Sequence, residues 1–119
     1  MLMDKKDIAY QIGIFIEKAS IKKELGTPTM KLPKCKLQIT GIYQIKVDEE
    51  SLVKFSNLWT FKAQANVNLF DSTSKVTLNR TSEIIGNVII EPVINQMDST
   101  IQPTILSVEI TNIKYSSKQ

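Results

Sequence analysis

The chain has 119 residues, a formal net charge of +3 and a hydrophobic fraction of 42%. A chain of this length forms a single domain, 1–119, and buries enough apolar surface to fold without disulfides or metals. It contains no histidine and one cysteine, which excludes a histidine base, a Cys/His pair and a zinc cage. We therefore expect no cofactor and no bound metal.

The apolar runs are too short to cross a bilayer, which needs about 20 residues. The first residues include charged and polar side chains and lack the uninterrupted apolar core of a signal peptide. We therefore expect a cytoplasmic protein without a membrane span.

Residues 4–25 have the periodicity of an amphipathic helix. Apolar side chains recur every three or four positions, at Ile8, Ile12, Phe15, Ile16 and Ala19. Asp4 is a suitable N-cap, and Gly26 followed by Pro28 is a suitable C-terminal stop. Gly13 lowers the helix propensity, which indicates a close approach to the body of the domain.

The chain from residue 34 to residue 115 has a period of two and predicts a β-rich body. One long strand would bury Leu37, Ile39, Gly41, Tyr43, Ile45 and Val47. The next would bury Trp59, Phe61, Ala63, Ala65, Val67 and Leu69. Gly41 marks a bulge or a sharp bend. Between the two strands, residues 52–55 are expected to form a short helical turn over the end of a barrel.

The last third of the chain predicts further strands. A turn at residues 71–74 joins the second long strand to residues 76–78 in a hairpin. The nearly continuous apolar run within residues 83–94 favours a strand that is buried on both faces. Residues 95–103 resemble a polar loop. The final strand alternates through Leu106, Val108 and Ile110 until Thr111, where a change of parity predicts a β-bulge.

These elements predict an α+β domain. An N-terminal helix would pack on a five- or six-stranded, strongly bent mixed sheet or small barrel. The clean alternation supports the sheet, because a slip of one residue would turn the apolar set to solvent.

The basic residues are concentrated in one part of the chain. Seven lysines lie between residues 18 and 46, against one acidic residue, Glu24. Such a cluster favours a phosphate backbone, because each neutralised phosphate releases counterions. We expect five lysines to anchor phosphates: Lys22, Lys23, Lys31, Lys34 and Lys36. Four polar residues are expected to flank them along the strands: Gln38, Gln44, Lys46 and Lys62.

The alternative interpretation is a solvated sheet face, on which Lys, Gln and Thr are common. Aromatic stacking is a second requirement for binding single strands. The exposed candidates for stacking are Tyr10, Phe70 and Tyr115, because Tyr43 has the parity of the core. The single arginine, Arg80, counts against sharp base readout, since Arg makes most bidentate contacts to bases.

We expect no enzymatic activity. The acidic residues 48–50 are adjacent on a turn and point in different directions, which is unsuitable for a carboxylate pair. One rival function is a protein-interaction module of a conjugation or phage system, acting through an exposed sheet edge. Another is a small-ligand pocket under the helix, between Phe15, Trp59 and Phe61.

Three segments carry a resemblance to a known family: residues 5–10 (KKDIAY), 22–28 (KKELGTP) and 32–37 (LPKCKL). The chain resembles, over nearly its full length, the small PrgU-like regulators of pheromone-responsive conjugative plasmids of Gram-positive cocci. The resemblance implies a PUA-like RNA-binding fold. It also implies a non-enzymatic role in limiting plasmid-encoded surface adhesins through their transcript, by binding an mRNA leader or intergenic segment. It supplies no catalytic residue and no RNA-contact motif.

Overall fold

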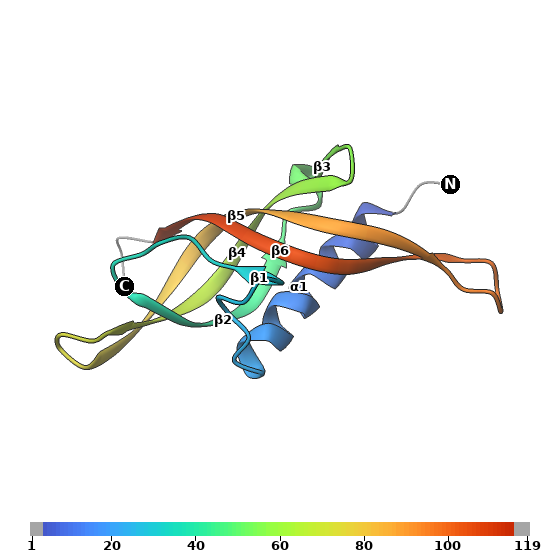
Figure 1. Cartoon of the computed structure of the whole chain (residues 1–119). Coiled ribbons are helices and arrows are strands. Elements are labelled where there is room, and N and C mark those ends of the chain that lie inside the picture. The colour runs from blue at the N-terminus through green and yellow to red at the C-terminus, as the bar shows by residue number, and fades with distance from the viewer. Residues whose placement is uncertain (1–3, 116–119) are drawn as a thin grey trace.

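The computed structural model describes residues 4–115 and has the predicted α+β architecture, with one helix packed on a six-stranded mixed sheet (Figure 1). The helix is α1 (Lys5–Ile21). The strands are β1 (Met30–Lys31), β2 (Gln38–Val47), β3 (Val53–Phe55), β4 (Leu58–Asp71), β5 (Val76–Ile94) and β6 (Ile101–Tyr115). A short 3-10 turn, η1 (Glu49–Ser51), precedes β3.

The sheet has the strand order β1-β6-β5-β4-β2, and β3 pairs with β4. Among the strands of residues 4–115, the pairing of β1 with β6 is the only parallel one. The two ends of this order, β1 and β2, do not pair, so the sheet is open; of the two predicted forms, the mixed sheet is confirmed and the small barrel is wrong. The physical reason is that α1 packs against both β2 and β6 and fills the hollow of the curved sheet (Figure 1).

The helix begins where the sequence predicts. The Asp4 side chain accepts a hydrogen bond from the Lys6 N–H at 2.9 Å, which confirms Asp4 as the N-cap. The helix ends at Ile21, four residues before the predicted end. Its C-cap is followed by Lys23 with a φ of 58°, a left-handed conformation that stops the helix before Gly26 is reached.

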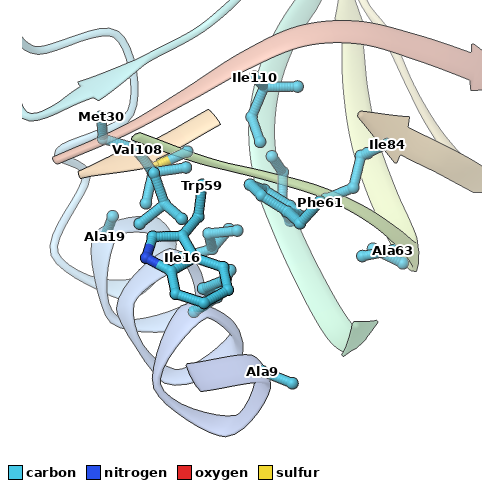
Figure 2. Packing of buried hydrophobic residues seen from close by; sticks show 14 of the residues in the cluster. Ala9, Ile16, Ala19, Met30, Trp59, Phe61, Ala63, Ile84, Val108 and Ile110 are labelled. Carbon is cyan, nitrogen blue, oxygen red and sulfur yellow. The ribbon is translucent and has the colours of Figure 1, made fainter. Parts of the chain in front are cut away.

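The core lies between α1 and the concave face of the sheet. The predicted helix stripe is confirmed, because Ile8, Ile12 and Ile16 are fully buried. Figure 2 shows Trp59 beside Ile16, and Phe61 further along the sheet. The sheet side of the core is formed by Ile39, Ile42, Trp59, Phe61, Ala63, Ala65, Val67, Leu69, Ile84, Val88, Ile90, Val108 and Ile110.

Two β-bulges interrupt β2, and at each of them the alternation of inward and outward side chains is reversed. The register of β2 against β4 shifts between Ile39 and Gly41, as predicted for Gly41, and again between Tyr43 and Lys46. The first shift turns Ile42 into the core, where it is fully buried. It also turns Tyr43 away from the core, which contradicts the predicted burial of that side chain.

Strand β5 is one continuous strand of 19 residues, and a turn joins it to β4 as predicted. Ile84, Val88 and Ile90 are buried on its inner face, whereas Ile85 and Ile89 on its outer face are only half-buried. The prediction of burial on both faces is therefore wrong. Within residues 4–115, α1 is the only helix longer than one turn, and it covers the inner face alone.

The remaining differences concern β3 and β6. The predicted β-bulge at Thr111 is confirmed, because Asn112 pairs with Ile85 and Ile110 pairs with the next residue of β5. A second shift leaves Leu106 unpaired and exposed. The polar loop is shorter than the predicted 95–103, because β6 begins at Ile101. The region 52–55 contains β3 and not a helical turn, and β1 begins before residue 34.

Candidate nucleic-acid interface

The candidate interface lies on the outer face of the sheet, defined as the side of β2, β4 and β5 turned away from α1. Residues that pair directly across two antiparallel strands point to the same side. Tyr43 pairs with Asn66, and Asn68 pairs with Asn79, so these four side chains share the outer face. We call the five neighbouring amide side chains the amide patch: Gln44, Gln64, Asn66, Asn68 and Asn79.

Hydrogen bonds order the amide patch. The Asn66 side-chain N–H donates to Gln44 Oε1, and the Asn79 side-chain N–H donates to Asn68 Oδ1. The Thr81 hydroxyl donates to Asn66 Oδ1 at 3.2 Å. Each amide has two N–H donors and an oxygen with two lone pairs, so these bonds use only part of its capacity. The patch therefore presents oriented donors and acceptors to whatever covers this face.

Tyr43 lies across Gly41 at one side of the amide patch. A Cβ atom on Gly41 would lie 2.9 Å from both Cζ and Oη of the Tyr43 ring, closer than real Cβ contacts. The missing side chain of Gly41 thus lets the ring lie close over the strand. The ring is half-buried, and its position on the polar face gives the sheet an aromatic surface on which a base can stack.

Phe70 extends this aromatic surface toward the end of β4. It pairs with Gln38 and lies on the outer face two residues beyond Asn68, which pairs with Gly41. Two residues of a strand span about 7 Å, so the Tyr43 ring and Phe70 occupy neighbouring rows of the sheet. Two aromatic side chains in neighbouring rows can hold successive bases of an extended single strand.

Two of the predicted lysines border the amide patch. Lys46 pairs with Gln64, and Lys62 lies two residues before Gln64 on the same face. Both lysines line a hollow of about 340 Å³ together with the acidic residues Asp48 and Glu83. The hollow therefore combines both signs of charge, and the acidic residues reduce its attraction for phosphate.

Gln38 and Lys23 lie together at the other end of β2. They line a hollow of about 370 Å³ with Thr40, whose hydroxyl donates to the Asn68 carbonyl at 3.3 Å. Lys23 therefore lies at the β2 edge beside one end of the outer face, and Lys46 and Lys62 lie at the other end, with the amides and aromatic rings between them. Among the nine predicted site residues, five lie on or beside this face: Lys23, Gln38, Gln44, Lys46 and Lys62.

The other four predicted lysines lie elsewhere. Lys22 lines a hollow beside Met30 on the far side of the helix end. Lys31 is in β1, at the opposite edge of the sheet, where it pairs with Glu109. Lys34 and Lys36 are exposed in the connection between β1 and β2. The lysines that are close in sequence therefore do not form one surface.

The other aromatic candidates for stacking are not on the outer face. Tyr10 is exposed on α1. Tyr115 donates a hydrogen bond to Cys35 Sγ at 3.6 Å, beside the two connecting lysines. Burial, and then the contact with Cys35, raise the pKa of Tyr115 to about 12.

The sequence pattern missed Tyr43, the residue that gives the outer face its aromatic character. Two bulges within six residues of β2 reverse and then restore the alternation of inward and outward side chains. If a constant period of two is assumed, the residues between the bulges are assigned to the wrong face. The one available signal was Gly41, since glycine inside a strand marks a bulge.

Within residues 4–115, no group of three or more His, Cys, Asp and Glu side chains is placed to hold a metal ion. None of the described helices is long and apolar enough to span a bilayer. No family model, curated protein or solved structure matches the chain.

Proposed function

We propose that the protein binds single-stranded RNA on the outer face of its sheet. Tyr43 and Phe70 stack on successive bases, the amide patch forms hydrogen bonds with base edges, and Lys23, Lys46 and Lys62 bind the flanking phosphates. Single-stranded RNA exposes unstacked bases to this combination of rings, amides and ammonium groups. The bound protein acts by occupancy and changes the elongation, decay or translation of a transcript.

The observation that carries the proposal is the position of the Tyr43 ring over Gly41, next to the ordered amide patch. An aromatic ring on the solvent side of a sheet gains less from burial than a core ring does, and it is suited to stacking. A ring beside oriented amides supplies the two elements of base recognition, stacking and edge hydrogen bonds. The few lysines around the face then contribute affinity that does not depend on sequence.

The resemblance to the PrgU-like regulators directs the proposal toward a biological role. From this resemblance, we propose that the protein is a non-enzymatic regulator with a PUA-like RNA-binding fold and that it limits expression of plasmid-encoded surface adhesins at the transcript level. Its target would be an mRNA leader or an intergenic segment in the cytoplasm.

The alternative of strand addition by a partner has less support at β2. The Ser20 hydroxyl of α1 accepts a hydrogen bond from the Ile42 N–H at 2.9 Å and lies 3.0 Å from the Ile42 carbonyl oxygen. The helix therefore occupies the backbone groups that an added strand would need at that point.

The proposal is tested by fluorescence anisotropy with the full chain and labelled 20-nucleotide probes: single-stranded RNA, single-stranded DNA and duplex DNA. Titrations at 50 mM and 200 mM salt separate phosphate contacts from stacking. The Tyr43→Leu variant keeps an apolar cover over Gly41 but removes the aromatic face. Loss of one stacked base weakens RNA binding about 5- to 150-fold, because each stacked base contributes about 1–3 kcal/mol.

Tyr10→Leu is the matched control, since Tyr10 is an exposed tyrosine on α1 and its replacement leaves RNA affinity unchanged. The Lys46→Ala/Lys62→Ala double variant removes two phosphate contacts. It therefore lowers the salt slope, the change of log K with log salt concentration, by about 1.4, because each contact with a single strand contributes about 0.7. Absence of RNA binding at low salt would refute the proposal. Binding that is unaffected by Tyr43→Leu would place the site elsewhere, and a preference for DNA would exclude a transcript as the target.

A further inference from the structure

The ends of β5 and β6 project beyond the rest of the sheet as a two-stranded arm, residues 90–105 (Figure 1). Strand β4 begins at Leu58, which pairs with Ile89, so in the described residues the arm continues past the last pairing with β4. From residue 90 onward, β5 pairs with β6 alone. The base of the arm packs on the core, since Ile90 and Pro103 are buried, but its outer part extends as a two-stranded ribbon. Such a ribbon is only marginally stable in water unless another surface packs on it.

The tip of the arm is an ordered turn of mostly polar residues that exposes two apolar side chains, Ile94 and Met97. The Asn95 N–H donates to the Thr100 carbonyl, and the Ser99 N–H donates to the Asn95 carbonyl, both at 2.8 Å. The Asn95 side chain also accepts a hydrogen bond from the Met97 N–H at 2.9 Å. This turn holds Met97 with 94% of its surface exposed, and Ile94 beside it is 64% exposed. Val93, 46% exposed, lies next to Ile94, so three exposed apolar side chains are close in sequence at the end of the arm and offer a contact surface.

The edges of the arm are unsuited to strand addition. Pro92 of β5 pairs directly with Pro103 of β6. Proline has no N–H, so the two residues cannot exchange hydrogen bonds, and their backbone nitrogens face the outer edges of the arm. Each edge therefore lacks a donor at this position, which protects it against an added strand. A partner would have to contact the side chains of the arm.

The charge of the arm restricts what can cover it. Residues 81–113 contain four acidic residues and no lysine or arginine. Two of the four, Glu91 and Asp98, are on the arm. The Thr100 hydroxyl donates to Asp98 at 2.7 Å, and this bond, with that of the Thr100 N–H, lowers the pKa of Asp98. The arm is thus complementary to a surface that is apolar and bordered by lysines.

The protein itself has such a surface, in the groove between α1 and β2. The groove has a volume of about 720 Å³, and Ile14, Ile21 and Ile45 are among its apolar lining residues. Lys6, Lys18 and Lys46 line it, against two glutamates. We refer to it as the α1–β2 groove.

We propose that the arm of one chain docks in the α1–β2 groove of a second copy, and that reciprocal docking forms a symmetric dimer. Met97 and Ile94 contact the apolar floor, and the acidic residues of the arm lie beside the groove lysines. Reciprocal exchange closes the assembly at two chains and covers both apolar surfaces, whereas one-way docking would continue into a filament. The groove shares Lys46 with the proposed RNA-binding face, so the dimer is tested through the oligomeric state in the absence of RNA.

The first test is sedimentation equilibrium of the full chain between about 1 and 200 μM. We expect a reversible dimer for the wild-type chain and a monomer for Met97→Lys. Met97 is exposed on a turn, so its replacement leaves the fold intact, as the fluorescence of Trp59 will verify. Val76→Lys is the matched control, because Val76 is an exposed apolar residue at the other end of β5 and its replacement leaves the dimer unchanged.

The second test locates the contact. In a Cys35→Ser background, one preparation carries Met97→Cys and another carries Tyr10→Cys, a residue that lines the groove. Under mild oxidation, we expect a disulfide-linked product in the mixture that neither preparation forms alone. A wild-type chain that is monomeric at 200 μM would overturn the proposal. Cross-linking of the Met97→Cys chain with itself would also overturn it, because the arms would then contact each other.

Discussion

Replacement of Ser20 by alanine tests how the exposed edge of the sheet is covered. Ser20 is only 3% exposed, and its hydroxyl accepts the Ile42 N–H at 2.9 Å. Its own proton faces two acceptors, the carbonyl oxygens of Ile42 at 3.0 Å and Ile16 at 3.1 Å. Strand β2 is an edge strand, so the hydroxyl takes the place of a neighbouring strand at this point.

The expected cost follows from the group that loses its partner. A buried N–H left without an acceptor destabilises a protein by about 1–3 kcal/mol. Alanine is a better helix former than serine by a few tenths of a kcal/mol, which offsets part of the loss. We therefore expect Ser20→Ala to lower the free energy of unfolding by about 2 kcal/mol. The free energy of unfolding of a small domain falls by about 2 kcal/mol per M of urea, so the urea concentration at the unfolding midpoint should fall by about 1 M.

Urea unfolding followed by the fluorescence of Trp59, the single tryptophan, measures this change. Hydrogen exchange of the Ile42 amide measures the same bond directly, and exchange should accelerate in the variant. Ser72→Ala, in the exposed turn after β4, is the matched control and should leave the midpoint unchanged. A loss below about 0.5 kcal/mol, together with unchanged exchange at Ile42, would refute the reasoning.

Three further changes test the packing, the ionisation and the basic connection. Gly86→Ala should lower the free energy of unfolding by about 3 kcal/mol in the same urea assay. The reason is that the added Cβ would lie 2.5 Å from a backbone carbonyl oxygen of β6. An unchanged midpoint would contradict the pairing of β5 with β6. The raised pKa of Tyr115 means that its contribution to stability is complete below pH 10 and is lost as the pH rises toward 12. In an absorbance titration, one of the three tyrosines should therefore ionise later than the others, and Tyr115→Phe should remove that late step. Lys34 and Lys36 lie away from the outer face, so the Lys34→Ala/Lys36→Ala double variant should leave the salt slope of RNA binding unchanged, whereas a slope reduced by about 1.4 would show that these two lysines hold phosphates.

The sequence by itself determined the helix, the long strands and most of the core, but not the short strands β1 and β3. The recurrence of Ile8, Ile12 and Ile16 defines a helix face, and the alternation from Trp59 to Leu69 defines a strand face, because both periods are local properties of the backbone. The bulge at Thr111 was also predictable, since a single change of parity remains visible when long regular segments flank it.

The tertiary structure decided the open sheet, the face of Tyr43 and the extent of the arm. Two bulges close together in β2 cancel in the overall alternation, so the residue between them is placed only when β4 fixes the register. The role of Ser20 depends on a contact with Ile42, 22 residues away, which no local pattern encodes.

The distribution of the lysines shows the same limit. Seven lysines are neighbours in sequence, but the chain between residues 22 and 46 leaves the helix, crosses one edge of the sheet and returns at the other. Strand order therefore separates Lys31 from Lys46, and it brings Lys62 beside Lys46 from a different strand. Sequence sets which side chains are available, whereas the pairing of distant strands decides which of them share a surface, because that pairing is fixed by contacts between residues far apart in the chain.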